Sequence, residues 1–256
     1  MRQLNAVTSE NLSSSSRFTL SLASTPEEVR EVQRLRYQVF VEGMGLDALA
    51  NAERLDRDEF DEHCDHLIVR DNRTLQVVGT YRLLSPQAAR RIGQYYSEQE
   101  FEMARLNHLR PNMVEAGRAC IHPDYRSGAV IMLLWSGLAD YLKRKNSHYL
   151  IGCASVSLAD GGQNALSIYH ALNDNNIAPA ECRVRPRLPF PVGERPAEPQ
   201  HVYIPPLIKG YLRSGAWVCG EPAWDPDFNC IDLFMLMPLA KLDTRYARHF
   251  VEARAA

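Results

Sequence analysis

The stretch VEAGRACIHPDYRSG, residues 114–128, decides the fold of this chain. Residues 114–121 are small or apolar around one acid and one base, and they end shortly before Pro123, which predicts a buried strand. In residues 129–144 the apolar side chains recur at spacings of three and four, which predicts an amphipathic helix. A second strand is expected at 149–153, so the three elements predict a βαβ unit with a right-handed crossover.

The turn that joins the first strand to the helix is a candidate anion site. The first N–H groups of a helix have no acceptor within the helix, and the helix dipole favours negative charge at that end. We therefore expect a phosphorylated carrier to bind at this turn and at the start of the helix, through Tyr125, Arg126, Ser127, Gly128 and Ala129.

Composition limits the classes of function. The 256 residues carry a formal net charge of -2 and have a pI near 6.5, which argues against nucleic-acid binding. The six cysteines are scattered without a C-x-x-C pair, as expected of reduced thiols in the cytoplasm. Every apolar run is far shorter than the ~20 residues that a membrane-spanning helix needs. We expect a cytoplasmic protein that is at most peripheral to the inner membrane.

One domain is expected. Residues 1–17 are polar and predict a disordered leader, and neither a repeat nor a break divides residues 18–256. A capping box from Thr25 to Glu28 predicts the start of a helix that ends near Gly43. The other expected elements are strands at 18–23, 67–70, 76–84, 217–219 and 231–237, helices at 86–110, 165–172 and 205–213, a surface connection at 183–199, and a last helix at 242–251.

Glu115 and Arg118 are the acid and the base of the central strand. In a regular strand they face opposite sides of the sheet, because side chains alternate with a period of two. Gly117 between them permits a β-bulge, which would turn both side chains toward one cleft. Two interpretations stay open here: a catalytic pair in a cleft, or an ion pair that holds the sheet together.

The order of motifs resembles known acyltransferase families. The strand with Glu115, the turn at 123–126 and the following helix resemble the central motif of the GNAT superfamily. RYQVF at 36–40, DEFD at 58–61, GTYRLL at 79–84, Phe101 and EAGR at 115–118 resemble, in order, the pattern of acyl-homoserine-lactone synthases, which take acyl chains from acyl carrier protein. GCAS at 152–155, PPLIKGYLRSGA at 205–216 and the strand with Asp232 resemble the bacterial ornithine N-alpha-acyltransferases of ornithine-lipid synthesis, over roughly residues 18–250.

This resemblance implies a fold, a reaction and a partner. The fold is a mixed α/β (α+β) GNAT-type domain, with a central sheet flanked by helices. The reaction is transfer of a 3-hydroxyacyl chain from acyl carrier protein to the alpha-amine of ornithine, which gives lyso-ornithine lipid. The donor is a substrate linked through 4'-phosphopantetheine, whose phosphate the expected anion site at residues 125–129 receives, and no cofactor is implied. Acyl carrier protein is acidic, so candidate docking patches are Arg90 and Arg91, residues 143–145, and Arg183, Arg185 and Arg187.

With the resemblance, residues receive expected roles. Glu115 is the candidate general base, directly or through a water, because apolar neighbours raise the pKa of a carboxylate. Arg118 and Arg82 are expected to bind the carboxylate of the amino acid, and Asp58 and Asp61 its amine. Arg36 is expected either to pair with the acidic loop, residues 46–65, or to lie on the solvent face of its helix. Phe40 and Phe101 are expected either in the core or, as in the related synthases, along the acyl or acceptor pocket.

Other interpretations are weighed against these. Asp58 and Asp61 would be solvated charges of a surface loop. Cys153 has no identifiable histidine to activate it, and HCDH at 63–66 lacks a further ligand set for zinc, so neither a covalent acyl-enzyme nor a metal is expected.

The alternative functions are an N-acyl amino acid or acyl-homoserine-lactone synthase that uses acyl carrier protein, and a non-catalytic module that binds acyl carrier protein or regulates at a membrane. The helix at 242–251 would touch that membrane or pack on the core.

Overall fold

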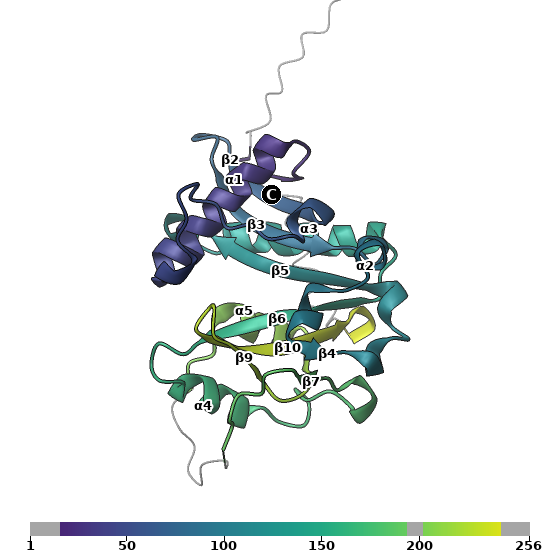
Figure 1. Cartoon of the computed structure of the whole chain (residues 1–256). Coiled ribbons are helices and arrows are strands. Elements are labelled where there is room, and N and C mark those ends of the chain that lie inside the picture. Colours follow the sequence, from purple (N-terminus) through teal and green to yellow (C-terminus); the bar gives the residue numbers. More distant parts are fainter. Residues whose placement is uncertain (1–15, 194–201, 242–256) are drawn as a thin grey trace, which may run out of the picture.

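The computed structural model describes residues 16–193 and 202–241, and within them a mixed sheet is the centre of the molecule (Figure 1). In spatial order its strands are β1 (Phe18–Leu22), β2 (Asp65–Asp71), β3 (Val77–Leu84), β5 (Met113–Ile121), β6 (Tyr149–Ser157), β10 (Cys230–Pro238) and β8 (Trp217–Val218), and β9 (Ala223–Asp225) also pairs with β10. Paired strands of this sheet run antiparallel except β5 and β6, which run parallel. A small second sheet joins β4 (Phe101–Glu102) to β7 (Arg185–Pro186).

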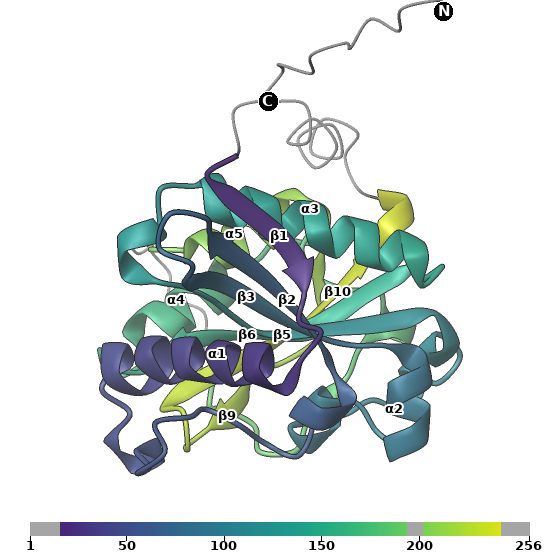
Figure 2. The same cartoon turned by 90° about the horizontal axis from the view of Figure 1, so that it is seen from above.

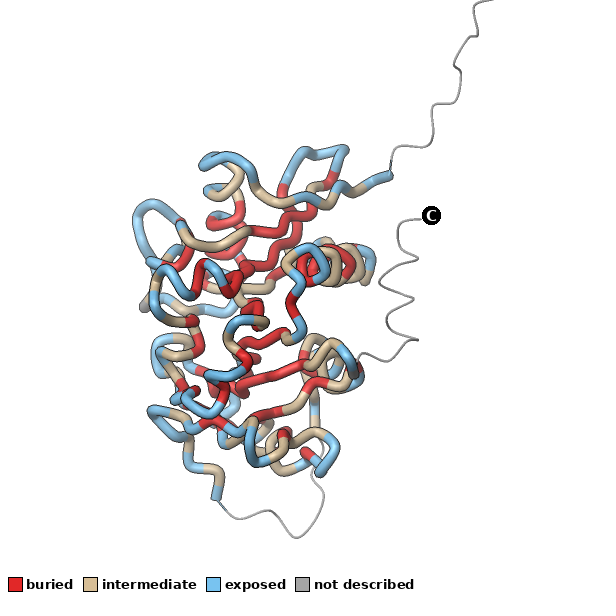
Figure 3. Tube along the Cα trace, turned by 90° about the vertical axis from the view of Figure 1, so that its right-hand side faces the viewer, coloured by how far each residue is buried: buried red, intermediate tan, exposed pale blue. Residues whose placement is uncertain are grey.

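Helices cover the sheet on opposite faces. Figure 2 shows α1 (Pro26–Arg36) on one side of the sheet and α3 (Ala129–Arg144) on the other. The remaining α-helices of the described residues are α2 (Pro86–Ile92), α4 (Gln163–Ala171) and α5 (Pro206–Arg213). Figure 3 shows the buried residues concentrated along the strands and on the helix faces that meet them. The expected mixed sheet flanked by helices is therefore confirmed.

The βαβ unit expected around residue 114 is present as β5, α3 and β6. The apolar stripe of α3, which includes Val130, Leu134 and Leu138, is buried in the main core. A Cβ atom on Gly79 of β3 would lie 2.5 Å from Cγ1 of Val130, so this glycine lets the first turn of α3 approach the sheet closely.

The start of α1 follows the expected capping box. Thr25 Oγ1 accepts a hydrogen bond from the backbone N–H of Glu28 at 3.2 Å, and Pro26 opens the helix. The helix continues as a π-helix over Tyr37–Glu42. π-Helical turns are often found at functional sites.

The expected helix at 86–110 is wrong. Ser85 caps α2 at its start, and α2 ends at Ile92 because Gly93 adopts a left-handed backbone with φ of 87°. The chain then forms the 3-10 helix Tyr96–Gln99, strand β4 and two further short 3-10 helices at Ala104–Leu106 and Arg110–Asn112. The remaining helices and strands expected within the described residues are present, with boundaries shifted by a few residues at most.

Some expectations fall outside the described part of the chain. These are residues 1–15 of the expected leader, residues 194–199 of the surface connection and the helix at 242–251. Within residues 16–193 and 202–241, no helix has both the length and the apolar character needed to cross a membrane.

The parallel pair at the centre of the sheet separates after three residue pairs. Met113, Val114 and Glu115 pair with Tyr149, Leu150 and Ile151, and beyond them β5 stays with β3 while β6 stays with β10. Figure 1 shows the two halves of the sheet diverging from this point. At the point of divergence a Cβ on Gly152 would lie 2.2 Å from the carbonyl oxygen of Ala116, so the closest approach of the two strands requires glycine.

Candidate active site

A cavity of about 610 Å³ opens where β5 and β6 diverge. Most of its lining comes from residues 40–46 after α1, residues 115–119 of β5, residues 153–159 of β6 and the turn that follows, residues 205–211 at α5, and residues 225–232 of β9 and β10. The rest of the lining is Phe60, Cys64, Tyr81, Arg82, Leu84 and Tyr96. Glu115, Arg118, Arg82 and Phe40 line it, so four of the expected site residues meet there.

Glu115 is a buried carboxylate held by the 3-10 helix Tyr96–Gln99. Its side chain is 4% exposed. Oε2 accepts a hydrogen bond from the backbone N–H of Tyr96 at 2.6 Å, and Oε1 accepts one from the backbone N–H of Ser97 at 2.8 Å and another from the Ser97 hydroxyl. Burial raises the pKa of Glu115 above the usual value of 4.5, although these hydrogen bonds and the charge of Arg82 act in the opposite direction.

The β-bulge expected beside Gly117 is present. Arg82 lies opposite Gly117 and Thr80 lies opposite Cys120, so two residues of β5 face one residue of β3. The left-handed backbone of the bulge falls on Arg118, with φ of 48°, rather than on the glycine. A non-glycine residue rarely adopts this conformation. The bulge places Arg118 on the cavity with Glu115, as the bulge hypothesis required.

Arg118 is surrounded by aromatic rings and carboxylates. Its guanidinium lies 4.5 Å from the ring centroid of Phe228 and 5.5 Å from that of Tyr96. Nη2 donates to Asp58 Oδ2 at 3.3 Å, but the buried Nε of Arg118 has no hydrogen-bond partner among the residues that the structure describes. A buried N–H donor that has no acceptor and lies beside a cavity can bind an anionic group of a ligand.

Three arginines and three aspartates form a closed ring of ion pairs behind the cavity wall. Nitrogen–oxygen distances around the ring are 2.6 Å for Arg36 to Asp56, 2.8 Å for Arg36 to Asp61, 2.9 Å for Arg82 to Asp61, 2.5 Å for Arg82 to Asp58, 3.3 Å for Arg118 to Asp58 and 4.0 Å for Arg118 to Asp56. The formal charges of the ring cancel. Its effect is to attach the acidic loop to α1, β3 and β5.

The electrostatics of the ring follow from its burial. Arg36 is 0% exposed. Burial alone would raise the pKa of Asp61, but Arg36 and Arg82 outweigh burial and lower the pKa to about 2. Burial would also raise the pKa of Asp58, but Arg82 and Arg118 outweigh burial and hold this pKa below 3.8. Both aspartates are therefore ionised and already paired with arginines.

Several predicted residues thus lie outside the cavity lining. Arg36 does pair with the acidic loop, as expected, and Asp58 and Asp61 are not the solvated charges of the alternative interpretation. Neither aspartate lines the cavity. Both form ion pairs with Arg82, which does line it. Phe101 is fully buried and packs edge to face on Phe234, with ring centroids 5.6 Å apart. The structure thus places Phe101 in the core.

The expected anion site forms the N-terminus of α3. Gly128 precedes the helix with φ of 96°, a backbone that favours glycine, and its carbonyl accepts from the N–H of Met132 at 3.1 Å. The Tyr125 ring packs against Phe18 and His122, with centroid distances of 6.1 and 5.5 Å. Because β5 leads into this turn, the helix N-terminus lies beyond the open end of the diverging strands.

Sequence reasoning missed a second group of acidic residues, beside Cys153. Side-chain ligand atoms of Glu100, Cys153 and Asp232 lie within 4.8 Å of one another, and so do those of Asp225, Cys230 and Asp232. Asp225, Cys230, Asp232 and Cys153 line the cavity. Burial and the neighbouring Asp232 raise the pKa of Glu100 to about 10. The available signal was one acid, Asp232, inside the otherwise apolar strand CIDLFMLMP at 230–238.

The thiols of the cavity are protonated. Burial raises the pKa of Cys153 well above its usual value, and its Sγ donates to Ser97 Oγ at 3.3 Å. Burial also raises the pKa of Cys64 to about 12. Among the described residues, the groups close enough to hold a metal do not include the segment 63–66.

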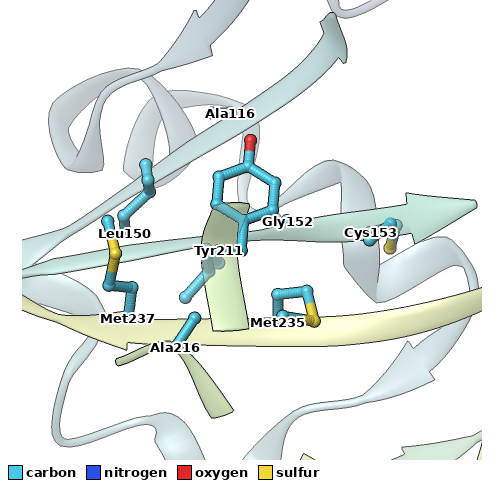
Figure 4. Close-up of a pocket in the computed structure, with 10 residues that line it drawn as sticks. Ala116, Leu150, Gly152, Cys153, Tyr211, Ala216, Met235 and Met237 are labelled. Atoms are coloured by element: carbon cyan, nitrogen blue, oxygen red, sulfur yellow. The ribbon is translucent and has the colours of Figure 1, made fainter. Parts of the chain in front are cut away.

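Tyr211 connects this cavity to a smaller one. An apolar pocket of about 20 Å³, shown in Figure 4, is lined by side chains that include Leu150, Met235 and Met237. The Tyr211 ring points from α5 toward β5 there, and its hydroxyl is hydrogen bonded to that of Tyr81. Neither tyrosine was a predicted site residue.

Comparison with known proteins identifies the fold. Residues 35–136 match the family model described as acetyltransferase (GNAT) domain. Among solved structures, TofI in a ternary complex with an inhibitor and MTA has a TM-score of 0.53 and 13% identity, and covers 92% of this chain and 97% of its own. The acyl-homoserine lactone synthase BjaI with MTA has a TM-score of 0.51 and 15% identity, with coverages of 90% and 93%. The fold is that of the GNAT acyltransferases.

Curated relatives define the family more narrowly. The L-ornithine N(alpha)-acyltransferase of Brucella abortus (strain 2308) is 34% identical over 246 residues, which cover 90% of this chain and 87% of the relative. That of Rhizobium meliloti (strain 1021) is 34% identical over 245 residues, with coverages of 90% and 82%. The chain belongs to the L-ornithine N(alpha)-acyltransferase family, and it is an N-acyltransferase.

Proposed function

We propose that this enzyme transfers a 3-hydroxyacyl chain from acyl carrier protein to the α-amine of L-ornithine and so forms lyso-ornithine lipid. The acceptor is supported by the names of the curated relatives, which are 34% identical over about 90% of the chain. The observation that carries the proposal is the cavity at the divergence of β5 and β6, where a buried carboxylate with a raised pKa and an arginine with an unpartnered Nε meet.

The donor arm enters along the divergence of the strands. Past Glu115, β5 has no pairing with β6, so an extended chain fits between their backbones. Its phosphate lies at the N-terminus of α3, at Gly128 and the residues around it, where free N–H groups and the helix dipole favour an anion. Such an arm reaches from the surface at α3 to the thioester beside Glu115.

The amino acid binds on the opposite side of the thioester. Among the described residues Arg118 Nε has no hydrogen-bond partner, so it offers a charged donor to an α-carboxylate in the cavity, which Arg82 also lines. The aspartates of the ring balance the formal charge of the arginines, but in the described part of the chain they leave Nε of Arg118 without an acceptor. Asp58 and Asp61 therefore act by holding the two arginines rather than by binding the amine.

Glu115 then removes a proton from the α-ammonium. Each carboxylate oxygen offers about two lone pairs. Oε1 already accepts two hydrogen bonds from Ser97, whereas Oε2 accepts only one, from Tyr96. Oε2 is therefore the atom that takes the proton, directly or through a water. The raised pKa of Glu115 brings its basicity closer to that of the amine.

Acyl transfer follows by direct attack. The neutral α-nitrogen forms a bond to the thioester carbon, the carbon–sulfur bond breaks, and the sulfur leaves with the electron pair. The proton that the nitrogen loses as the amide forms passes to the thiolate, which gives the free phosphopantetheine thiol. The protonated state of Cys153 favours this route over a covalent acyl-enzyme.

The proposal is tested with purified protein, 3-hydroxyacyl carrier protein and L-ornithine. We expect release of the carrier thiol together with a product whose mass equals ornithine plus the 3-hydroxy fatty acid minus water. Parallel reactions use the matching acyl-coenzyme A, other amino acids and S-adenosylmethionine. Preference for S-adenosylmethionine would favour a lactone synthase, and preference for another amino acid would change the acceptor. Thiol release with none of the amines would leave a non-catalytic carrier-binding module.

A further inference from the structure

The cavity contains negative charge that the mechanism above does not use. Asp225 and Asp232 line it, and Glu100 lies beside Asp232. In residues 16–193 and 202–241, none of the three forms an ion pair with a lysine or arginine, whereas Asp56, Asp58 and Asp61 all do. The cavity thus has one wall with arginines and one wall with carboxylates.

Asp232 is the key residue of this second wall. It is 3% exposed and belongs to β10, where its neighbours Ile231 and Leu233 are fully buried. Within the described part of the chain, its Oδ1 has no hydrogen-bond partner. Burying a carboxylate oxygen without a partner costs free energy, and that cost disappears when a cation or donor arrives.

The other two acids surround Asp232 on two sides. Asp225 comes from β9, which pairs with β10 beside it, and Asp225 Oδ1 accepts a hydrogen bond from the N–H of Phe228 at 3.0 Å. Glu100 comes from the turn between the 3-10 helix and β4, and its Oε2 also lacks a partner. Burial, the neighbouring Asp232 and a side-chain hydrogen bond between the two carboxyl groups raise the pKa of Glu100 to about 10, so Glu100 is protonated at neutral pH.

A short series of side-chain contacts connects Asp232 to Glu115. Cys153 and Ser97 separate Asp232 from Glu115: Cys153 Sγ donates to Ser97 Oγ, and Ser97 binds Glu115. On the arginine side, the Phe228 ring contacts Arg118 while its backbone N–H binds Asp225. An acid–base pair for the α-amine and α-carboxylate therefore adjoins a carboxylate site at a short distance.

We propose that Asp232, assisted by Asp225 and Glu100, binds the side-chain ammonium of a basic amino-acid acceptor. This inference rests on the proposed function, since it takes the α-amine of that acceptor to lie at Glu115. It makes Asp232 a specificity-determining residue. The enzyme selects a short amino acid with a terminal cation because only such a side chain satisfies the unpartnered Oδ1.

The test compares acceptors that differ only in this cation. Rates of acyl transfer from one acyl carrier protein thioester are measured with L-ornithine and with L-norvaline, which has the same carbon chain without the amine. The variants are Asp232→Asn and Asp225→Asn, and the matched control is Asp227→Asn, an exposed acid of the same turn that does not line the cavity.

We expect kcat/KM of the unaltered enzyme to favour ornithine strongly. In Asp232→Asn, kcat/KM for ornithine should fall by about 10- to 100-fold, the range for a lost charged hydrogen bond, with little change for norvaline. Asp225→Asn should show a smaller change in the same ratio, and Asp227→Asn none. An unchanged ornithine-to-norvaline ratio in both cavity variants would overturn the inference.

A binding measurement separates this inference from the proposed function. Isothermal titration of the full chain with ornithine and norvaline, without acyl donor, needs no turnover. Ornithine-selective binding that Asp232→Asn abolishes supports the subsite even if no acyl transfer is found. Equal binding of both ligands overturns it, and so does a stoichiometric divalent metal in the purified protein that Asp232→Asn removes.

Discussion

Ser97 gives Glu115 two hydrogen bonds to the same oxygen, one from its backbone N–H and one from its hydroxyl. With the Tyr96 N–H on the other oxygen, the first turn of a 3-10 helix fixes the orientation of the candidate base. Glu115 is therefore a poor partner for Arg118, and the structural ion pair considered for these two residues is absent from the ion pairs of the described residues.

Replacing the candidate base tests its role. In Glu115→Gln we expect turnover to fall by about 100-fold or more, because the amide cannot accept the amine proton. In the unaltered enzyme kcat/KM should rise with pH through the raised pKa of Glu115, since the ionised form is the base. A circular dichroism spectrum and melting temperature control for folding. Near-normal turnover in a folded variant would remove Glu115 from the mechanism.

The Ser97 hydroxyl has a separable effect. In Ser97→Ala the backbone N–H still binds Oε1, so we expect a loss of about tenfold in kcat, with KM for the acyl donor unchanged. The reason is that an oxygen freed of one bond becomes a competing proton acceptor in the wrong position. Steady-state kinetics measure kcat and KM for the acyl donor separately. A change confined to KM for the donor would contradict this account.

Asp61 should make stability depend on pH. Its pKa is lowered from 3.8 to about 2 in the folded protein, so its ionisation stabilises the fold above pH 3.8, and this contribution is lost as the pH falls toward 2. The pH-dependent part is about 2 kcal/mol. Asp61→Asn should cost about 3–5 kcal/mol at pH 7, because it leaves Arg36 buried with fewer partners.

Denaturant unfolding of both proteins at several pH values measures this difference. We expect the two free energies of unfolding to converge between pH 3.8 and pH 2. A difference that stays constant over this window would show that the arginines do not hold the proton off Asp61.

Replacing Gly152 by alanine, which adds one methyl group, tests the close approach of β5 and β6. In Gly152→Ala the new Cβ would lie 2.2 Å from the Ala116 carbonyl oxygen, so the strands must move apart. We expect a loss of stability of about 1–3 kcal/mol and a large fall in activity. Gly117→Ala is the matched control on stability, because nothing lies within 4 Å of a Cβ there. Equal melting temperatures for the two variants would contradict the packing argument.

Cys153 should be dispensable for the chemistry. Its thiol is buried and its pKa is raised, so the thiolate is absent at neutral pH. We expect Cys153→Ala to retain most of the turnover, and intact-mass spectrometry after mixing with acyl donor alone should find no acyl adduct. An acylated enzyme that Cys153→Ala abolishes would restore the covalent route.

Local sequence patterns predicted the parts of the fold whose signals are themselves local. The βαβ unit follows from periodicity, and the glycine between the acid and the base permitted the bulge without requiring it. The region 86–110 failed because Gly93 ends α2 while the residues after it remain compatible with helix. Helix propensity could not reveal that the backbone N–H groups of Tyr96 and Ser97 bind the carboxylate of Glu115 on β5.

The candidate site divides in the same way. Glu115 and Arg118 lie three residues apart on one strand, so a single bulge at Gly117 is enough to bring both side chains to one cavity. The acidic wall of the cavity joins residues 100, 225 and 232, which come together only through the pairing of β9 with β10 and the packing of the segment before β4. An isolated acid in an apolar strand signals a buried charge, but the sequence does not name its neighbours.

The ring of arginines and aspartates has a consequence for how mutations combine. Each aspartate is shared by two arginines, so removal of one acid alters the environment of two bases at once. Double-mutant cycles within the ring should therefore be strongly non-additive, because the second substitution acts on partners that the first has already released. In evolutionary terms, such a circuit is expected to change by coordinated replacement of several members or not at all.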